Sequence, residues 1–332
     1  METTTAQDRQ VLAAVSSASS RQRLSVDAVA GRVALLLVLI IAASWLQPGF
    51  GTFENARTIL LAVATVGVMA LGMTLVLLAG ELDLSIGGVA VVSGVVGGML
   101  LHSGSVALVV AGVLATGVLC GAINGWLVTR LRVPSLIVTL GMLGMLRAVA
   151  NILSGGQAIY PEGVEAYLWF GRGAILGIPV PIVVFMVAAL AAIILVRHSR
   201  FGRALYAVGG NAAAAALSGI RVDRVRLCVF VVSGLTAALA GLLETARLAY
   251  IGPAGFTGIE LSVIAIATLG GVSLAGGRGS VEGTILAALI IGVVNNALNI
   301  AGVSSYVQQI VTALVILCVV LPDSLQRKER QA

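Results

Sequence analysis

Long apolar runs alternate with short polar stretches along most of the chain. A helix needs roughly 17 to 25 apolar residues to cross the hydrocarbon core of a bilayer, and ten runs meet or approach that length. The first and the eighth are short, so each extends beyond its bounds or is partly re-entrant. The ten runs lie at 33–46, 59–79, 84–101, 106–128, 135–153, 174–196, 225–246, 260–275, 281–301 and 305–321.

The pattern therefore predicts an all-α integral membrane protein with about ten transmembrane helices. Composition excludes a soluble fold, because 59% of the residues are hydrophobic and only 10% are charged, against about 25% charged in soluble domains. A transmembrane β-barrel would show alternating segments of about ten residues, and these runs are longer and continuous. We expect one transmembrane domain at 33–321, between a polar tail at 1–32 and a second tail at 322–332.

The arginines predict an orientation, because cytoplasmic loops of membrane proteins carry an excess of Arg and Lys. With the N-terminus placed in the cytoplasm, only four of the 20 Arg and Lys residues fall outside cytoplasmic segments: Arg57, Arg147, Arg172 and Arg247. Both termini are therefore expected in the cytoplasm. The basic pI of about 9.8 follows from this distribution and does not indicate a nucleic-acid partner.

Glycine is abundant inside the apolar runs, with 41 residues in the chain. Small residues let helix backbones approach closely in lipid, so the glycines of one run predict tight helix packing: Gly87, Gly88, Gly94, Gly97 and Gly98. A second glycine run, 276–283, lacks the strand–turn–helix context of a dinucleotide loop and is expected to form a tight turn.

Enzymatic and nucleotide-binding functions find no support in the sequence. The single lysine, Lys328, lies in the C-terminal tail, so the chain lacks a P-loop and any ATP-driven work must come from another polypeptide. The three cysteines and two histidines lack metal-ligand spacing. We expect no enzymatic activity, cofactor or metal site in this chain.

Two acids, Glu81 and Asp83, stand between apolar runs and are followed by Ser85. Charges at membrane depth are costly and often mark function, so a role in gating or in the solute path is one interpretation. Capping of a helix that begins near Ser85 is the other, and both uses are compatible. Asn124 and Asn295 lie inside other runs, where they line a polar path or form interhelical hydrogen bonds.

Around these acids the sequence resembles the ribose/xylose-type permeases of bacterial ABC importers, which are related to the branched-chain amino-acid permeases. The family's Gly-x-Ile-Asp-Leu-Ser-Val-Gly-like stretch appears here as Gly80 to Gly87. Met142 departs from the family, which usually has threonine there, and Arg147 and Ala148 stand where the family commonly has an Arg-Gly pair. The likeness runs in the family's order over roughly 50–321, through NGWLV (124–128), VPSLIVTLG (133–141), FGRALYAVGGN (201–211), ALSGI (216–220), SGLTAALAGLL (233–243) and IATLGGVSLAGGRGSVEGT (266–284).

The resemblance implies a channel-forming permease subunit that moves a monosaccharide or similar small polar solute across the bacterial cytoplasmic membrane. It also implies a homodimer or a paralogous pair, two ATP-hydrolysing subunits and an extracytoplasmic solute-binding protein. An ion-coupled secondary transporter that uses Glu81 or Asp83 is the alternative. No chain of buried acids or histidines in the sequence favours that alternative.

The resemblance also assigns a role to the internal loop 197–224, where five arginines flank an Ala-rich stretch. Alanine favours helix, and Gly219 is placed to end it. The stretch resembles the coupling helix that docks on the ATPase, with Asn211, Ala213, Ala214, Ala215, Ser218 and Gly219 as its residues. The importer signature Glu-Ala-Ala-x-x-x-Gly falls on 213–219 with alanine in place of glutamate, so the polar anchor stays open. An ordinary amphipathic loop is the alternative.

Two weaker features remain. Arg147 either faces a polar path within the bundle or extends to the membrane interface. Leu78-Ala79-Gly80 precedes Ser85 much as Leu274-Ala275-Gly276 precedes Ser280; transporters often contain inverted repeats, and this similarity hints at one.

Overall fold

The computed structural model describes residues 29–161, 165–304, 306–308, 310–311 and 313–314. The predicted tail at 322–332 and most of the predicted tail at 1–32 lie outside these residues, as does most of the span predicted at 305–321. Within the described part, eight helices are long and apolar enough to cross a membrane. They are Val29–Leu46, α2 (Phe53–Leu78), α3 (Ile86–Leu100, continued by the turn η1, Leu101–Ser103), α4 (Val106–Arg130), α5 (Ser135–Ser154), α7 (Val180–His198), α10 (Val222–Leu248) and α12 (Val281–Ile300).

The span predicted at 260–275 is helical only over α11 (Ile259–Leu269), which has 11 residues. At 1.5 Å per residue this is about 16 Å, roughly half of the hydrocarbon thickness. The segment predicted at 174–196 begins as a hairpin of β1 (Ala174–Ile175) and β2 (Ile178–Pro179), with Ala174 opposite Pro179. The all-α membrane fold is thus confirmed, whereas the count of ten spans is not.

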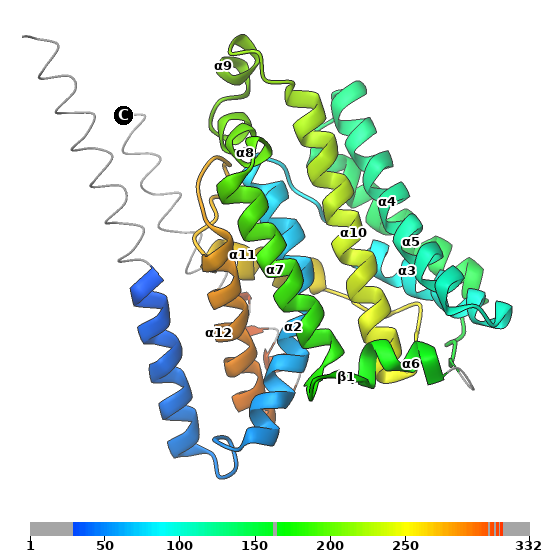
Figure 1. Ribbon diagram of the computed structural model, residues 1–332, viewed down its shortest axis with the longest axis vertical. Coiled ribbons are helices and arrows are strands. Elements are labelled where there is room, and N and C mark those ends of the chain that lie inside the picture. The colour runs from blue at the N-terminus through cyan, green and yellow to red at the C-terminus, as the bar shows by residue number, and fades with distance from the viewer. Residues whose placement is uncertain (1–28, 162–164, 305, 309, 312, 315–332) are drawn as a thin grey trace, which may run out of the picture.

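Three shorter helices lie at the two ends of the bundle (Figure 1). α8 (Arg200–Gly210) and α9 (Ala212–Leu217) lie at one end, which we call the α9 end. α6 (Glu165–Arg172) lies with the hairpin at the other, which we call the α6 end. The sequence predicted one helix in the loop 197–224, and the structure has two there.

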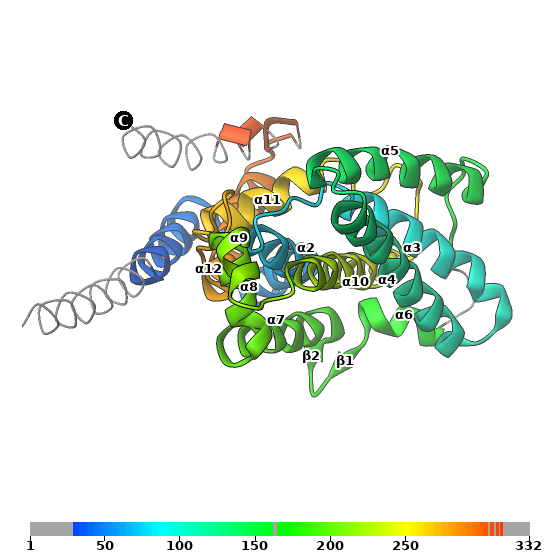
Figure 2. The same ribbon diagram turned by 90° about the horizontal axis from the view of Figure 1, so that it is seen from above.

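The helices α2 and α10 occupy the middle of the bundle, as Figure 2 shows from above. α10 packs against α4, α2 and α3, and α2 packs in turn against α12, α7 and α11. Helix Val29–Leu46 lies at the periphery. α2 and α10 are also long, with 26 and 27 residues. They therefore run between the two ends of the bundle and contact most of the other helices on the way.

Glycine allows the closest helix contacts, as predicted. A Cβ on Gly117 of α4 would overlap the carbonyl oxygen of Gly234 of α10, and a Cβ on Gly234 would overlap that of Gly117. On α3, a Cβ on Gly98 would lie 2.9 Å from Ile159, and one on Gly97 would lie 2.8 Å from Val113. Backbones therefore approach where apolar burial alone cannot hold helices together in lipid.

Candidate functional site

The break between α2 and α3 carries a buried cluster of hydrogen-bonded polar side chains. Asp83 is 1% exposed. Its Oδ1 accepts from the backbone N–H of Ser85 at 2.9 Å and from the Ser85 hydroxyl at 2.6 Å. Its Oδ2 accepts from the Ser233 hydroxyl of α10 at 2.7 Å, and Asn124 of α4 donates from Nδ2 to Ser85 Oγ at 2.7 Å. The structure thus brings three predicted residues together and adds Ser233.

Glu81, two residues earlier, uses a different partner. Its Oε1 lies 2.7 Å from Nε of Arg226 of α10, and the Glu81 side chain is 8% exposed. Arg226 and Ser233 are seven residues apart, which is close to two helical turns, so they lie on one face of α10. The break is therefore tied to that face at two points, once by an ion pair and once by a hydrogen bond.

Asn295 does not join this cluster. It lies partly buried in α12, and its neighbour Asn296 accepts from Nδ2 of Asn55 at 3.0 Å. Asn55 belongs to the first turn of α2, far along that helix from the break. Asn55 and Asn296 therefore form an interhelical hydrogen bond. A role for Asn295 in a polar path stays a prediction.

Three backbone segments meet without intervening side chains beside the break. Gly277 donates its N–H to the carbonyl of Leu78 at 3.0 Å. A Cβ on Gly209 of α8 would overlap the same carbonyl, and a Cβ on Gly276 would lie 2.7 Å from the Gly80 Cα. We call this meeting of 78–80, 209–210 and 276–277 the glycine junction. It joins the end of α2, the end of α8 and the turn between α11 and α12.

Side chains reinforce the glycine junction. The Tyr206 hydroxyl of α8 donates to the carbonyl of Gly279 at 2.8 Å. Burial raises the pKa of Tyr206, and the Glu282 carboxylate raises it further, so the hydroxyl keeps its donor proton. Arg197 at the end of α7 pairs with Glu282 of α12 at 2.8 Å. The tight turn predicted at 276–283 is confirmed only as far as Ser280, with positive φ at Gly276 and at Gly277, because α12 begins at Val281.

The two Leu-Ala-Gly stretches that hinted at a repeat lie side by side in the structure. Gly277, directly after the second stretch, donates its N–H to the carbonyl of Leu78 in the first. The inverted repeat itself stays a prediction.

The Ala-rich stretch folds as predicted. Asn211 caps α9 by accepting from the Ala214 N–H at 3.0 Å, and Ser218 donates to the Ala214 carbonyl at 3.0 Å. Gly219 follows the helix with φ +82°. Leu217 is 91% exposed at the tip of the bundle. An exposed leucine on a short, well-capped helix is suited to insertion into a pocket of another protein.

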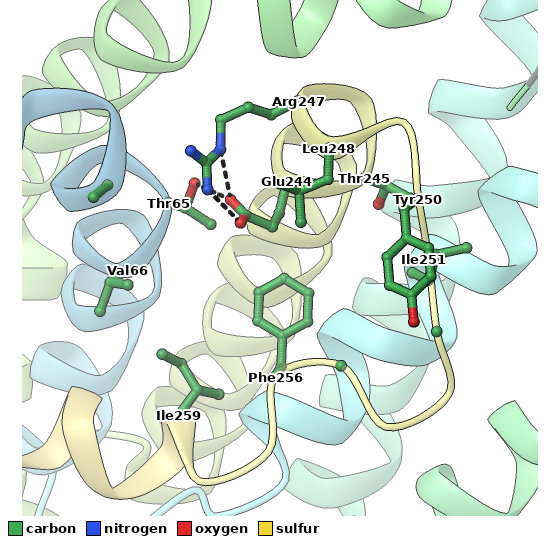
Figure 3. A pocket seen from close by; sticks show the side chains of 13 residues that line it. Thr65, Val66, Glu244, Thr245, Arg247, Leu248, Tyr250, Ile251, Phe256 and Ile259 are labelled. Atoms are coloured by element: carbon green, nitrogen blue, oxygen red, sulfur yellow. Dashed lines mark hydrogen bonds and ion pairs between the residues drawn. The ribbon is translucent and has the colours of Figure 1, made fainter. Parts of the chain in front are cut away.

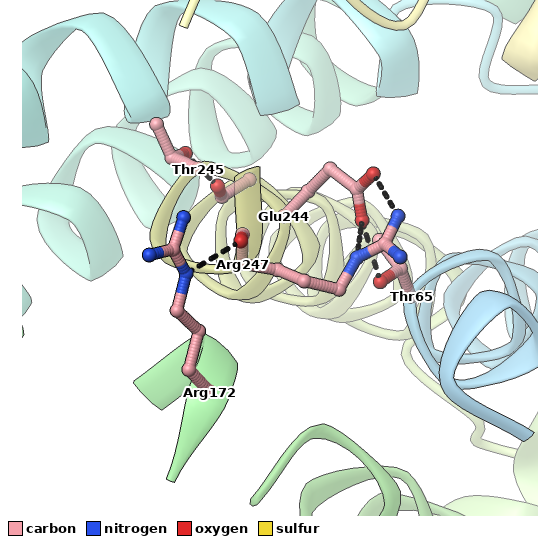
Figure 4. Close-up of polar contacts among 6 residues, drawn as sticks. Thr65, Arg172, Glu244, Thr245 and Arg247 are labelled. Carbon is pink, nitrogen blue, oxygen red and sulfur yellow. Dashed lines mark hydrogen bonds and ion pairs between the residues drawn. The ribbon is translucent and has the colours of Figure 1, made fainter. Parts of the chain in front are cut away.

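A cavity of about 350 Å³ lies between α2, α10 and the connection to α11 (Figure 3). Glu244 and Arg247 of α10 form an ion pair inside it, with Arg247 Nη2 at 2.6 Å from Glu244 Oε1. Thr65 of α2 donates to Glu244 Oε2 at 3.0 Å (Figure 4). The sequence analysis missed Glu244, although an acid inside an apolar run with an arginine three residues later was a visible signal.

The connection 249–258 forms one wall of the cavity and is held by a side chain at one point and by main chain at another. Arg147 of α5 donates from Nη1 to the Thr257 hydroxyl at 3.0 Å and from Nη2 to the carbonyl of Phe256 at 3.3 Å. Phe256 has a φ of +54°, which is uncommon for a residue other than glycine. Ile251 forms an isolated antiparallel bridge with Ile159. Arg147 therefore packs against the connection 249–258 with its side chain 23% exposed, and a polar path at this residue stays a prediction.

Comparisons with known proteins agree with one another. Residues 55–320 match the family described as "Branched-chain amino acid transport system / permease component". The chain is 44% identical over 293 residues to the ribose import permease protein RbsC of Escherichia coli K12, covering 87% of this chain and 91% of that protein. It is 35% identical over 302 residues to the L-arabinose transport system permease protein AraH of the same organism, with 91% and 92% covered. No solved structure matches.

Proposed function

Because the chain belongs to the family of branched-chain amino acid transport system permease components, we propose that it is the permease subunit of an ABC importer for a pentose or similar monosaccharide. It is a multi-pass protein of the bacterial inner membrane. Relatives that import ribose and L-arabinose support the sugar class. ATP would be hydrolysed by separate subunits, since the sequence contains no P-loop.

The adjacency of α9 and the glycine junction carries the coupling part of the proposal. α9 presents Leu217 to its surroundings and follows α8, whose last two residues touch both helix breaks. A displacement of α8 and α9 by an ATPase would therefore move the end of α2 and the turn before α12 directly. The residues from Asn211 to Gly219 are the ATPase contact in this mechanism.

The Asp83 cluster transmits that displacement across the bundle. Asp83 and Ser85 belong to the moving break, while Ser233 and Asn124 belong to α10 and α4. Glu81 adds a second link to α10 through Arg226. We propose that these contacts make the break, α4 and α10 move as one gate, so Glu81, Asp83, Ser85 and Asn124 act in gating.

The assembly follows from the same assignment. The α9 end faces the cytoplasm in this proposal, in accord with the arginines of the loop 197–224, and both termini lie on that side. Two permease chains, identical or paralogous, associate with two ATPase subunits. A solute-binding protein docks at the α6 end and delivers the sugar.

Substitution of Leu217 tests the proposal. In cells that express the chain with its ATPase, Leu217→Glu should abolish co-purification of the ATPase and uptake of labelled pentose, because a buried charge opposes docking. Leu176→Glu is the matched control, since Leu176 is 98% exposed at the α6 end, and it should keep the ATPase bound. ATPase retained by Leu217→Glu would refute the docking site.

Sugar accumulation by the purified chain alone on a proton or sodium gradient would instead favour the secondary transporter.

A further inference from the structure

The cavity beside α10 is lined by two kinds of side chain that face each other. Thr65, Glu244 and Arg247 supply polar groups, and Tyr250 and Phe256 supply aromatic rings (Figure 3). Ligand pockets of about 300 to 1,000 Å³ are mostly apolar and aromatic, with a few placed polar groups that fix orientation. At about 350 Å³, this cavity is at the small end of that range, which fits a molecule of monosaccharide size.

The ion pair leaves hydrogen-bonding capacity for a ligand. A guanidinium carries five N–H groups, and the contacts within the described residues use the Nε–H and one Nη2–H of Arg247. A carboxylate accepts about four hydrogen bonds, and Glu244 accepts three, from Thr65 and from Arg247. Donors and an acceptor therefore remain side by side on one rigid helix, an arrangement that matches the neighbouring hydroxyls of a sugar.

The charges in the cavity favour an uncharged ligand. Glu244 and Arg247 cancel each other at 2.6 Å, so an anion or a cation would meet no net opposite charge. A zwitterionic amino acid would lose the hydration of two full charges on entering the cavity, which costs much more than removing water from hydroxyls. A polyol carries no such charges, and it adds hydrogen bonds to the pair as it stands.

The aromatic side chains complete the site. Phe256 and Tyr250 lie across the cavity from the ion pair, and their rings offer an apolar surface to the C–H face of a sugar. The Phe256 backbone is fixed by Arg147 at 3.3 Å, so this ring has a supported position. A molecule with one apolar face and an edge of hydroxyls satisfies both walls.

We propose that this cavity is a binding site for one uncharged monosaccharide within the permease, held by Thr65, Glu244 and Arg247 and packed on Phe256 and Tyr250. The proposal rests on the proposed function, which supplies the solute class. It adds that the permease itself contacts the sugar with specific hydrogen bonds, so that selectivity is not left entirely to the binding protein.

The binding site can be tested without any ATPase by asking whether a sugar protects a cysteine in the cavity wall from chemical labelling. Val66→Cys would be introduced into the full chain after Cys120, Cys228 and Cys318 are changed to Ala, and the purified protein would be labelled with a maleimide in nanodiscs. D-Ribose should slow labelling by about tenfold at ten times its Kd. L-Leucine should leave the rate unchanged.

Variants in the same background identify the residues. Glu244→Gln should reduce the protection by D-ribose severalfold, and Thr65→Val, which keeps the ion pair, should reduce it less. Glu54→Gln is the matched control, because Glu54 pairs with Arg57 at the same i,i+3 spacing on α2 but is exposed outside the cavity. Its protection should equal that of the parent. Elution as a single peak in size-exclusion chromatography checks that each variant is folded.

Three results would overturn the site: no protection by D-ribose in the parent, equal protection by L-leucine, or full protection in both Glu244→Gln and Thr65→Val. The proposed function fails separately. Loss of ATP-driven pentose uptake by the complete transporter, with D-ribose protection intact, would reject the importer and keep the site. ATP-driven pentose uptake without D-ribose protection would reject the site and keep the importer.

Discussion

The two ends of the bundle are held together by different chemistry. At the glycine junction, main chain touches main chain, and Gly277 bonds to Leu78 at 3.0 Å with no side chain between the segments. At the connection 249–258, Ile251 has a main-chain bridge to Ile159, but the part next to α11 is held by a side chain, with Arg147 at 3.0 and 3.3 Å from Thr257 and Phe256.

This difference bears on how each region can move. A direct main-chain contact has no side-chain torsions that could absorb a displacement, and close-packed protein interiors transmit strain. A long arginine can change rotamer and release its partners. The junction is therefore suited to transmit a movement, and the connection 249–258 is suited to let a solute pass.

The largest effect is expected where the junction is broken. Gly209→Val places a side chain on the Leu78 carbonyl, so the three segments must separate. ATP-driven uptake should fall to background while the chain still inserts in the membrane. Gly144→Val of α5 is the matched control, since a Cβ there meets nothing within 4 Å among the described residues, and its uptake should match the parent. Equal uptake by both variants would remove the junction from the mechanism.

A smaller loss is expected when the break is uncoupled from α10 and α4. Asp83→Ala leaves the Ser85 and Ser233 hydroxyls without their acceptor, and a buried polar group left without a partner costs about 1 to 3 kcal/mol. We expect a clearly lower melting temperature in detergent and strongly reduced uptake. Asp223→Asn, at the exposed start of α10, should change neither. An unchanged melting temperature for Asp83→Ala would contradict the cluster's role.

A milder effect is expected at the connection 249–258. Arg147→Gln removes the bonds to Thr257 and Phe256, which frees this wall of the cavity without disturbing the junction. Pentose uptake should drop several-fold, while ATPase binding and ATP hydrolysis stay at parent levels. Hydrogen exchange measured by mass spectrometry should rise in 249–258 and not in 276–283. An increase in hydrogen exchange confined to 276–283 would contradict the view that Arg147 holds the connection 249–258.

The smallest effect is expected at a single hydroxyl contact near the junction. Thr74 of α2 and Thr284 of α12 lie with their hydroxyls 2.7 Å apart, both buried. Interhelical hydrogen bonds in membranes average about 0.6 kcal/mol. A double-mutant cycle of Thr74→Val and Thr284→Val should therefore give an interaction energy of roughly that size. Uptake should stay near the parent value. A large loss would mean that side chains, too, are essential at this end.

Much of the fold could be predicted because each long span leaves its own apolar run. The short α11 misled the count, since Gly270 to Ala275 continue the apolar composition after the helix has ended. α8 was missed because its arginines and glycines obscure an amphipathic helix. The end of α9 at Gly219 was predictable, because a glycine with positive φ is a common helix terminus.

The site was predictable only in part. Asp83 and Ser85 are conspicuous acids and hydroxyls between apolar runs, and Asn124 is conspicuous within one. Ser233 is not, because a serine inside an α-helix is unremarkable until its distance to Asp83 is known. The cavity needed the fold as well, since Thr65 and Glu244 are 179 positions apart and only packing of α2 on α10 brings them together.

Helix α10 is a single uninterrupted helix that carries Arg226 near one end, Ser233 near its middle, and Glu244 and Arg247 near the other end. From Ser233 to Arg247 it rises about 21 Å. The residues proposed to bind a solute and those proposed to respond to the ATPase are thus separated by about three turns of helix, from Ser233 to Glu244. Changes near Glu244 could therefore alter the solute preference, in evolution or by design, while the glycine junction and the Asp83 cluster stay unchanged.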